Sequence, residues 1–355
     1  MVWNARIGLA SFLALFLVSG CKKKQQDVPV PPKPQQTTAT PEVPSPPAPA
    51  SGESSPPQPV SEQQERALRR YNENTWLVQQ AMQVGPSDET QSAAVTKLVK
   101  AAAPDWDHAN PTHAEIRGPE IAARLHPWIE MAGKQDAAKQ AAALLIADRI
   151  VVMEEEDGNL EPQDSEKAAT RGDASGKPPK SPAQVELERL GAGFTYELAS
   201  ERFRYALNWL QHAYELAPDG RAGELAFLAL MERGFDTSVN CAMGSDQFRE
   251  VIRRGAAYLK GKRSGDVEAR VHFMMGGAYR DIVALASGLQ DDNYADPNNY
   301  KSEASEARTK AIAEYRAGLA LDDKSEPSRI ARQHLGSLEA GEAPHDARFY
   351  CQVLD

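Results

Sequence analysis

Residues 310–325 read KAIAEYRAGLALDDKS, and residues 205–220 read YALNWLQHAYELAPDG. Both stretches carry four residues at successive spacings of 4, 3 and 5: Ala206, Leu210, Ala213 and Pro218 in one copy, and Ala311, Tyr315, Gly318 and Asp323 in the other. Spacings of three and four residues place side chains on one face of an α-helix. Small residues on such a face let two helices approach closely, and larger ones fill the groove between them. We therefore expect both copies to be packed helices.

The segments around the second copy extend the pattern. Residues 271–282 read VHFMMGGAYRDI and carry Met275, Gly276 and Tyr279, while ARQHLGSL at 331–338 offers Leu335 and Gly336. A large residue followed by Gly and an aromatic on one helix, then Ala, an aromatic and a small residue on the next, resembles the tetratricopeptide repeat. The resemblance implies an α-solenoid of stacked helix pairs over residues 183–340. The clustered apolar residues Phe273 and Met274 are expected to belong to its core.

The remaining globular sequence also has the features of helices. Apolar periodicity and flanking Pro or Gly predict helices at 62–82, 87–103, 119–131 and 137–153, and we find no strand pattern of period two. The run Glu154–Asp157 is expected to be a solvated helix end, opening a charged, Gly- and Pro-rich insertion at 154–182. We therefore predict an all-α protein with an N-terminal helical region at 61–153 and a tetratricopeptide-like domain at 183–355.

The N-terminus has the composition of an export signal. Arg6 is the one charge among residues 1–20, and an apolar run follows from Ile7 to Val18. Twelve residues cover only about 18 Å of helix, too short for a ~30 Å hydrocarbon core. Val18-Ser19-Gly20-Cys21 resembles the lipobox of bacterial lipoproteins. The resemblance implies cleavage before Cys21 and attachment of lipid to it. Lys22 in place of Asp after the cysteine resembles outer-membrane sorting, so we expect a lipid-anchored protein facing the periplasm.

Residues 21–60 are expected to tether the domain to the membrane. Twelve of the chain's 25 prolines fall in this segment, together with Ala, Ser, Thr and Gln and no apolar periodicity. Such a segment cannot bury enough apolar surface to offset the entropy of ordering it, so we expect a disordered linker.

The net charge of the chain indicates which kinds of partner to expect. The chain has a formal charge of −10, and we find no stripe of Lys and Arg interleaved with aromatic residues. An acidic surface repels phosphate backbones, so a nucleic acid is not an expected partner. If the groove of the helical domain is acidic as well, it favours a basic peptide.

Two further cysteines remain, Cys241 and Cys351. In an oxidising envelope they can form a disulfide, but two buried free thiols fit the sequence equally well. Neither has a CxxC partner or a neighbouring His, so thiol catalysis is not expected.

One loop invites a metal hypothesis. The sequence DWDHANPTHAE at 105–115 gathers five potential ligands: Asp105, Asp107, His108, His113 and Glu115. Their spacing matches no established metal motif, and a polar loop turning at Asn110-Pro111 explains the same residues. We therefore expect no metal and no other cofactor.

These observations favour a non-enzymatic scaffold anchored in the envelope membrane. The tetratricopeptide resemblance implies that a groove holds an envelope protein or peptide partner, in envelope, pilus or secretion assembly. The alternative is an all-helical metal- or ligand-binding lipoprotein or enzyme that uses the 105–115 loop.

Overall fold

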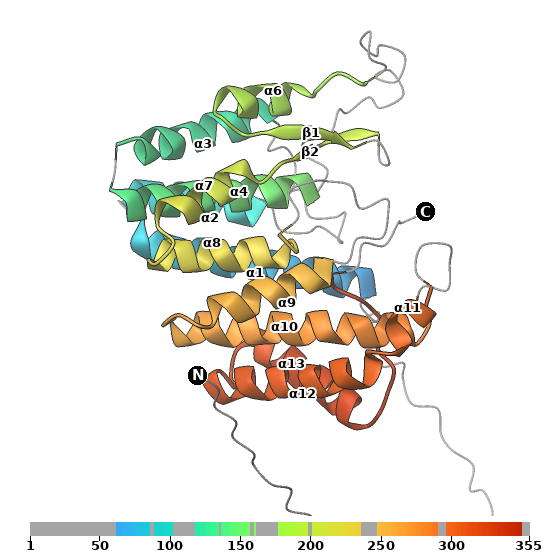
Figure 1. Cartoon of the computed structure of the whole chain (residues 1–355). Helices are drawn as coiled ribbons and strands as arrows, with labels where there is room; N and C mark the ends of the chain where they lie inside the picture. The colour runs from blue at the N-terminus through green and yellow to red at the C-terminus, as the bar shows by residue number, and fades with distance from the viewer. Residues whose placement is uncertain are drawn as a thin grey trace, which may run out of the picture. The chain divides into compact units, whose positions relative to one another are not determined.

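The computed structural model describes residues 62–85, 89–101, 118–134, 136–156, 160, 177–197, 201–235, 247–289 and 296–349. All of them belong to one structural unit, residues 59–355. This part of the chain is mostly helical, so the all-α prediction is confirmed (Figure 1).

Each of the four helices expected before residue 154 is present. The helices of this first part are α1 (Glu62–Val84), α2 (Glu89–Ala101), α3 (Gly118–Ala132), α4 (Ala137–Glu156) and α6 (Pro182–Arg189). Helix α6 begins at a capping box, in which the Ser181 hydroxyl accepts from the Gln184 backbone N–H and the Gln184 side chain accepts from the Ser181 N–H. Pro182 occupies the first turn, where its missing N–H leaves no intrahelical bond unmade.

A short antiparallel hairpin follows, and it corrects the expectation that strand patterns are absent. Strands β1 (Phe194–Glu197) and β2 (Arg202–Tyr205) pair with Phe194 opposite Tyr205. Aromatic residues alternate along both strands, and the ring centroids of Tyr196 and Phe203 lie 5.4 Å apart across the pair. Period-two patterning is therefore present, but over only four residues in each strand.

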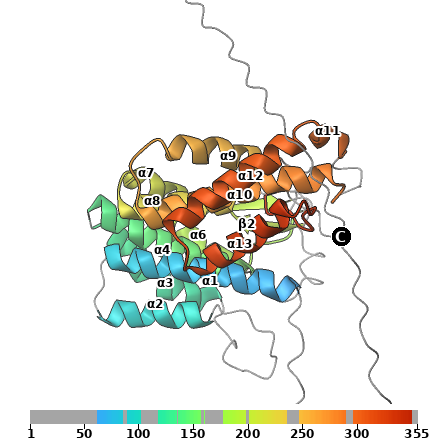
Figure 2. The same ribbon diagram turned by 90° about the horizontal axis from the view of Figure 1, so that it is seen from below.

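The second part consists of helices that pack against their neighbours in sequence. They are α7 (Asn208–Leu216), α8 (Arg221–Glu232), α9 (Gln247–Tyr258), α10 (Gly265–Ala286), α11 (Asn298–Lys301), α12 (Ala304–Leu321) and α13 (Glu326–Glu339). Helix α7 packs on α8, α9 on α10, and α12 on both α10 and α13. Figure 2 shows α12 and α13 lying over α10.

Helix α4 joins the two parts into one core. It packs against α1, α3, α7 and α8, and its residues 141–155 are all buried. The core is therefore continuous from Leu77 to Phe349 across the boundary expected between regions 61–153 and 183–355. The expected solvated end at Glu154 is wrong, because α4 continues to Glu156 and both Glu154 and Glu155 are buried.

The helices of the second copy show why small residues occur at its repeat positions. A Cβ atom on Gly276 would lie 2.9 Å from the Tyr315 ring, and one on Gly318 would lie 2.5 Å from Phe273. Glycine is thus required where α10 and α12 approach most closely. The inward positions Leu210, Ala213 and Ala311 are fully buried, Tyr279 is half-buried, and Ala206 and Pro218 flank α7 outside the helix.

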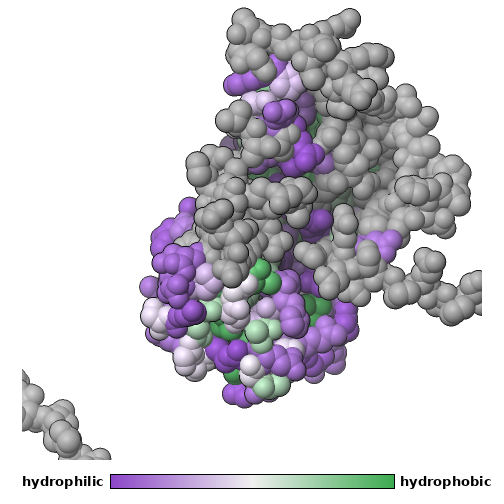
Figure 3. Space-filling model, turned by 90° about the vertical axis from the view of Figure 1, so that its right-hand side faces the viewer, coloured by the Kyte–Doolittle hydropathy of each residue, from purple (hydrophilic) through white to green (hydrophobic). Residues whose placement is uncertain are grey.

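The described surface is mainly hydrophilic on one face. On the face shown in Figure 3, the described residues are mainly hydrophilic, with isolated apolar residues between them. In the part of the chain that the structure describes, no helix is both long enough and apolar enough to cross a bilayer.

Candidate functional site

One cavity of about 350 Å³ collects residues from six helices and from the segment that follows α13. Its charged lining residues are Arg69, Arg70, Glu73, Arg149, Glu232, Arg233, Arg280, Asp346 and Arg348. Six arginines and three carboxylates are among these lining residues, and two further carboxylates, Asp148 and Glu155, pair with Arg149 and Arg233 from outside the lining. We call this site the arginine cavity. Arginines outnumber carboxylates in its lining, although the whole chain has a charge of −10. The cavity is therefore not an acidic groove.

A second part of the wall is apolar. Phe273 of α10, Ile330 and Ala331 of α13, Val152 of α4 and Ala347 line the cavity beside the arginines. The site therefore combines a charged region with an apolar one, as ligand pockets commonly do.

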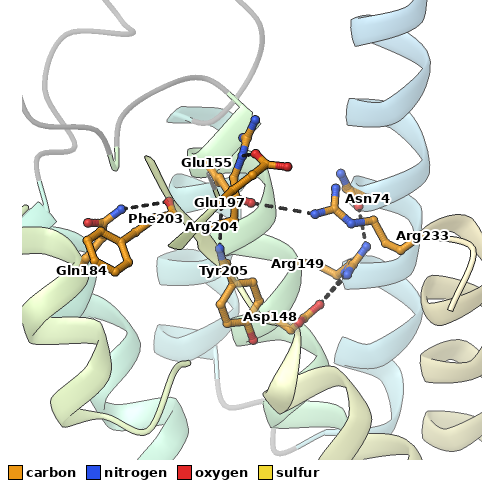
Figure 4. A network of polar contacts seen from close by, with 10 residues as sticks. All are labelled: Asn74, Asp148, Arg149, Glu155, Gln184, Glu197, Phe203, Arg204, Tyr205 and Arg233. Carbon is orange, nitrogen blue, oxygen red and sulfur yellow. Dashed lines mark hydrogen bonds and ion pairs between the residues drawn. The ribbon is translucent and has the colours of Figure 1, made fainter. Parts of the chain in front are cut away.

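The inner wall is built around Arg149, whose side chain is 1% exposed. Its Nε and Nη2 donate to Asp148 Oδ2 at 2.8 and 2.5 Å, and its Nη1 donates to Asn74 Oδ1 at 3.1 Å (Figure 4). The Glu232 carboxylate lies 3.9 Å from the same Nη1. These contacts tie α4 to α1 and α8 and hold the guanidinium in one position.

Glu232 is a carboxylate of the cavity whose pKa is strongly raised by its surroundings. Burial raises its pKa from 4.5 to about 7, and the nearby Glu73 carboxylate adds to the shift, while Arg149 opposes it. Part of the Glu232 population is therefore protonated at neutral pH. Protonation makes the cavity still more positive.

His334 and Tyr315 form a neutral pair in the same wall. The Tyr315 hydroxyl and His334 Nδ1 are 3.1 Å apart. Burial, together with the positive charge of Arg280, lowers the pKa of His334 to about 3, so the imidazole is neutral. Burial raises the pKa of Tyr315, so its hydroxyl keeps its proton and can donate it to Nδ1.

The segment after α13 closes one side. We call residues 346–349 the C-terminal strap. The Asp281 carboxylate is fully buried and accepts from the backbone N–H groups of Arg348 at 3.0 Å and Phe349 at 2.6 Å. Arg280 Nη2 lies 2.5 Å from Asp346 Oδ1, and Arg348 Nη2 lies 3.2 Å from Glu73 Oε2. The strap is therefore fastened to both α10 and α1.

The cysteines and potential metal ligands expected from the sequence fall where the structure gives no description. Cys21, Cys241, Cys351 and the 105–115 loop lie outside the described residues. Among the described residues, no three or more His, Cys, Asp or Glu side chains gather as metal ligands would. Of the repeat positions, Tyr315 contributes to the arginine cavity, Leu210, Ala213, Gly276, Ala311 and Gly318 are buried between helices, and Pro218 is exposed.

Sequence reasoning missed the arginine cavity because its residues are scattered from position 69 to position 348. A local signal did exist. Arg149 interrupts the apolar run AAALLIADRIVV, and Arg280 follows MMGGAY, so each places a cation on a helix that is otherwise buried. A charge within such a run must find a partner or face a cavity.

We compared the chain with protein-family models, with curated proteins and with solved structures, and none of the three comparisons finds a match.

Proposed function

We propose that this chain is a lipid-anchored protein of the bacterial envelope that binds an anionic group of a partner in the arginine cavity. The observation that carries the proposal is the set of six arginines around one cavity in a chain of net charge −10. Carboxylates of the chain already pair with several of these arginines, such as Asp346 with Arg280 and Glu73 with Arg348, so the cavity suits anions of this kind.

The arginines favour recognition over catalysis. Guanidinium groups keep their protons at all physiological pH values, so they position and neutralise anions and do not transfer protons. The neutral His334 is already engaged by the Tyr315 hydroxyl. We therefore propose a non-enzymatic binding role, which keeps the interaction scaffold expected from the sequence but changes the partner's charge from basic to acidic.

The architecture supports the same role. We propose that helices α7 to α13 are a tetratricopeptide-like solenoid, supported by the glycine-mediated approach of α10 and α12. The lipobox-like Val18-Ser19-Gly20-Cys21 and the Pro-rich 21–60 segment support an anchor with a long tether. A tethered solenoid can meet partners at a distance from the bilayer.

The test compares partners recovered from cross-linked envelopes that contain the full chain. Arg69 is half-buried in α1 and lines the cavity, so Arg69→Glu reverses a cavity charge outside the core. The control is Arg253→Glu, which makes the same charge change at an exposed position of α9. We expect a partner with the wild type and with Arg253→Glu, and its loss with Arg69→Glu. Equal recovery by all three proteins contradicts the proposal.

A further inference from the structure

The Asp346 carboxylate lies in the lining of the arginine cavity, where it pairs with Arg280. Arg280 Nη2 lies 2.5 Å from Asp346 Oδ1, and Arg280 Nη1 donates to the Asp346 backbone carbonyl at 3.2 Å. Burial alone would raise the pKa of Asp346, but the hydrogen bond and the positive charge of Arg280 hold it below its usual value. The chain thus places its own carboxylate, whose side chain is 41% exposed, against an arginine of the cavity.

His334 can add a donor to this position. Its Nδ1 faces the Tyr315 hydroxyl at 3.1 Å, and that buried hydroxyl keeps its proton. A neutral imidazole that accepts at Nδ1 carries its proton on Nε2, which is then free to donate to an anion. Three arginines, Arg69, Arg280 and Arg348, act electrostatically on the same ring.

We propose that Arg69, Arg280, Arg348 and His334 form a carboxylate subsite, which Asp346 fills in the free protein and from which a ligand carboxylate displaces it. This inference rests on the proposed function, because it names the anion that the arginine cavity takes. Only the Asp346 side chain has to move. The strap itself stays fastened through the Asp281 hydrogen bonds to the backbone of Arg348 and Phe349.

The apolar wall of the cavity indicates what kind of group is attached to the ligand's carboxylate. Phe273, Ile330 and Ala331 lie beside the charged residues and suit a short apolar group attached to the carboxylate. A volume of about 350 Å³ holds a small molecule or the last few residues of a chain, not a folded surface. The ligand is therefore a carboxylic acid with a short apolar group, either a polypeptide C-terminus ending in an apolar residue or a free organic acid.

The experiment measures binding of defined probes to the full chain by calorimetry. The probes are an N-acetylated tripeptide ending in leucine, the same peptide as its C-terminal amide, 4-methylpentanoate and inorganic phosphate. Asp346→Asn keeps the shape of the residue and removes its charge. The control is Glu306→Gln, which removes one negative charge at an exposed position of α12.

We expect Asp346→Asn to bind the free-acid probes roughly fivefold or more tighter than the wild type, which is the lower end of typical coupling between competing groups. Glu306→Gln should bind as the wild type does, and adding Arg280→Met to Asp346→Asn should abolish the gain. The peptide amide should not bind. The tighter of the two free acids identifies the source of the carboxylate.

Equal affinity of wild type and Asp346→Asn, tighter binding of phosphate than of either acid, or no binding of any probe by any variant overturns the inference. The proposed function is judged separately by the loss of the envelope partner with Arg69→Glu. If that loss is seen and Asp346→Asn changes nothing, the binding function stands and the carboxylate subsite falls.

Discussion

Asp148 and Arg149 are neighbouring charged residues in the middle of the core, and their side chains are 0% and 1% exposed. The pair is stable there because Arg149 also reaches Asn74 of α1 and Glu232 of α8. Full desolvation of an ion pair is costly unless hydrogen bonds satisfy most of its polar atoms. The pair therefore helps to specify how α1, α4 and α8 meet. Asp148 also holds Arg149, one of the cavity arginines, in place.

Removing Arg149 should be far more damaging than removing an exposed arginine. We expect Arg149→Ala to lower the free energy of unfolding by about 3–5 kcal/mol, because Asp148 and Glu232 lose their buried cation. Arg253→Ala removes a guanidinium from an ion pair in which the arginine is 67% exposed, and should change the free energy of unfolding far less, because solvent screens an exposed pair. Urea denaturation of both variants measures the difference. Similar values for the two would contradict the role given to the buried pair.

Glu232 should make stability depend on pH. Its pKa is raised by burial from 4.5 to about 7, so the folded protein binds a proton that the unfolded chain has lost. The stabilisation from this proton is complete below pH 4.5 and is lost as pH rises to about 7, by up to about 1.4 kcal/mol per pH unit. Glu232→Gln lacks this proton equilibrium. We expect the unfolding free energy of the wild type to fall relative to Glu232→Gln between pH 5 and pH 7.5; parallel curves would contradict the assignment.

At the scale of the element, α10 and α12 form the closest helix contact associated with the repeat pattern. Gly276 lies under the Tyr315 ring, and Gly318 lies under Phe273 and near the Ala269 carbonyl. Each helix thus contributes one glycine and one aromatic residue to the contact. This reciprocal arrangement explains why the spacing of small and large residues recurs between the two helices.

Two glycine substitutions should therefore act in opposite directions. A Cβ on Gly318 would lie 2.9 Å from the Ala269 backbone oxygen, so Gly318→Ala should destabilise the protein by about 1–3 kcal/mol through overpacking. A Cβ on Gly336 in α13 meets nothing within 4 Å, so Gly336→Ala should stabilise by roughly 0.5–1 kcal/mol through helix propensity. Thermal unfolding of both variants provides the measurement. Stabilisation by Gly318→Ala would show that the two helices are not held at this distance.

Some of the helices and strands could be predicted from the sequence, and others could not. Long helices such as α1 and α4 were predictable because apolar residues recur over many turns. The hairpin was not, because four residues in each strand give too short a pattern to separate from a loop. The charged Glu154 and Glu155 predict that the end of α4 lies in solvent, and that prediction is wrong. Instead, Glu155 Oε1 accepts from the Tyr205 backbone N–H at 2.7 Å, and this bond fixes β2 against the helix.

At the scale of the whole molecule, the N-terminal segment should decide where the protein resides. We expect Cys21→Ser to move the full chain from the membrane fraction to the soluble fraction of the envelope, because serine cannot accept the thioether-linked lipid that the lipobox-like sequence implies. Metabolic labelling with a radioactive fatty acid checks the lipid, and fractionation checks the location. Continued labelling or unchanged membrane association of Cys21→Ser would contradict lipidation at this cysteine.

The sequence by itself determined the helical class and most helix positions, because periodicity and capping residues act over a few neighbouring turns. The same local logic supports the lipid-anchor and tether proposals for the first 60 residues. Only the tertiary structure decided the arginine cavity. Arg69, Arg149, Arg280 and Arg348 are far apart in the chain, and packing of α1, α4, α10 and the C-terminal strap brings them together. The apolar runs around Arg149 and Arg280 indicate that these two cations are buried, but no local pattern shows which residues of distant helices lie beside them.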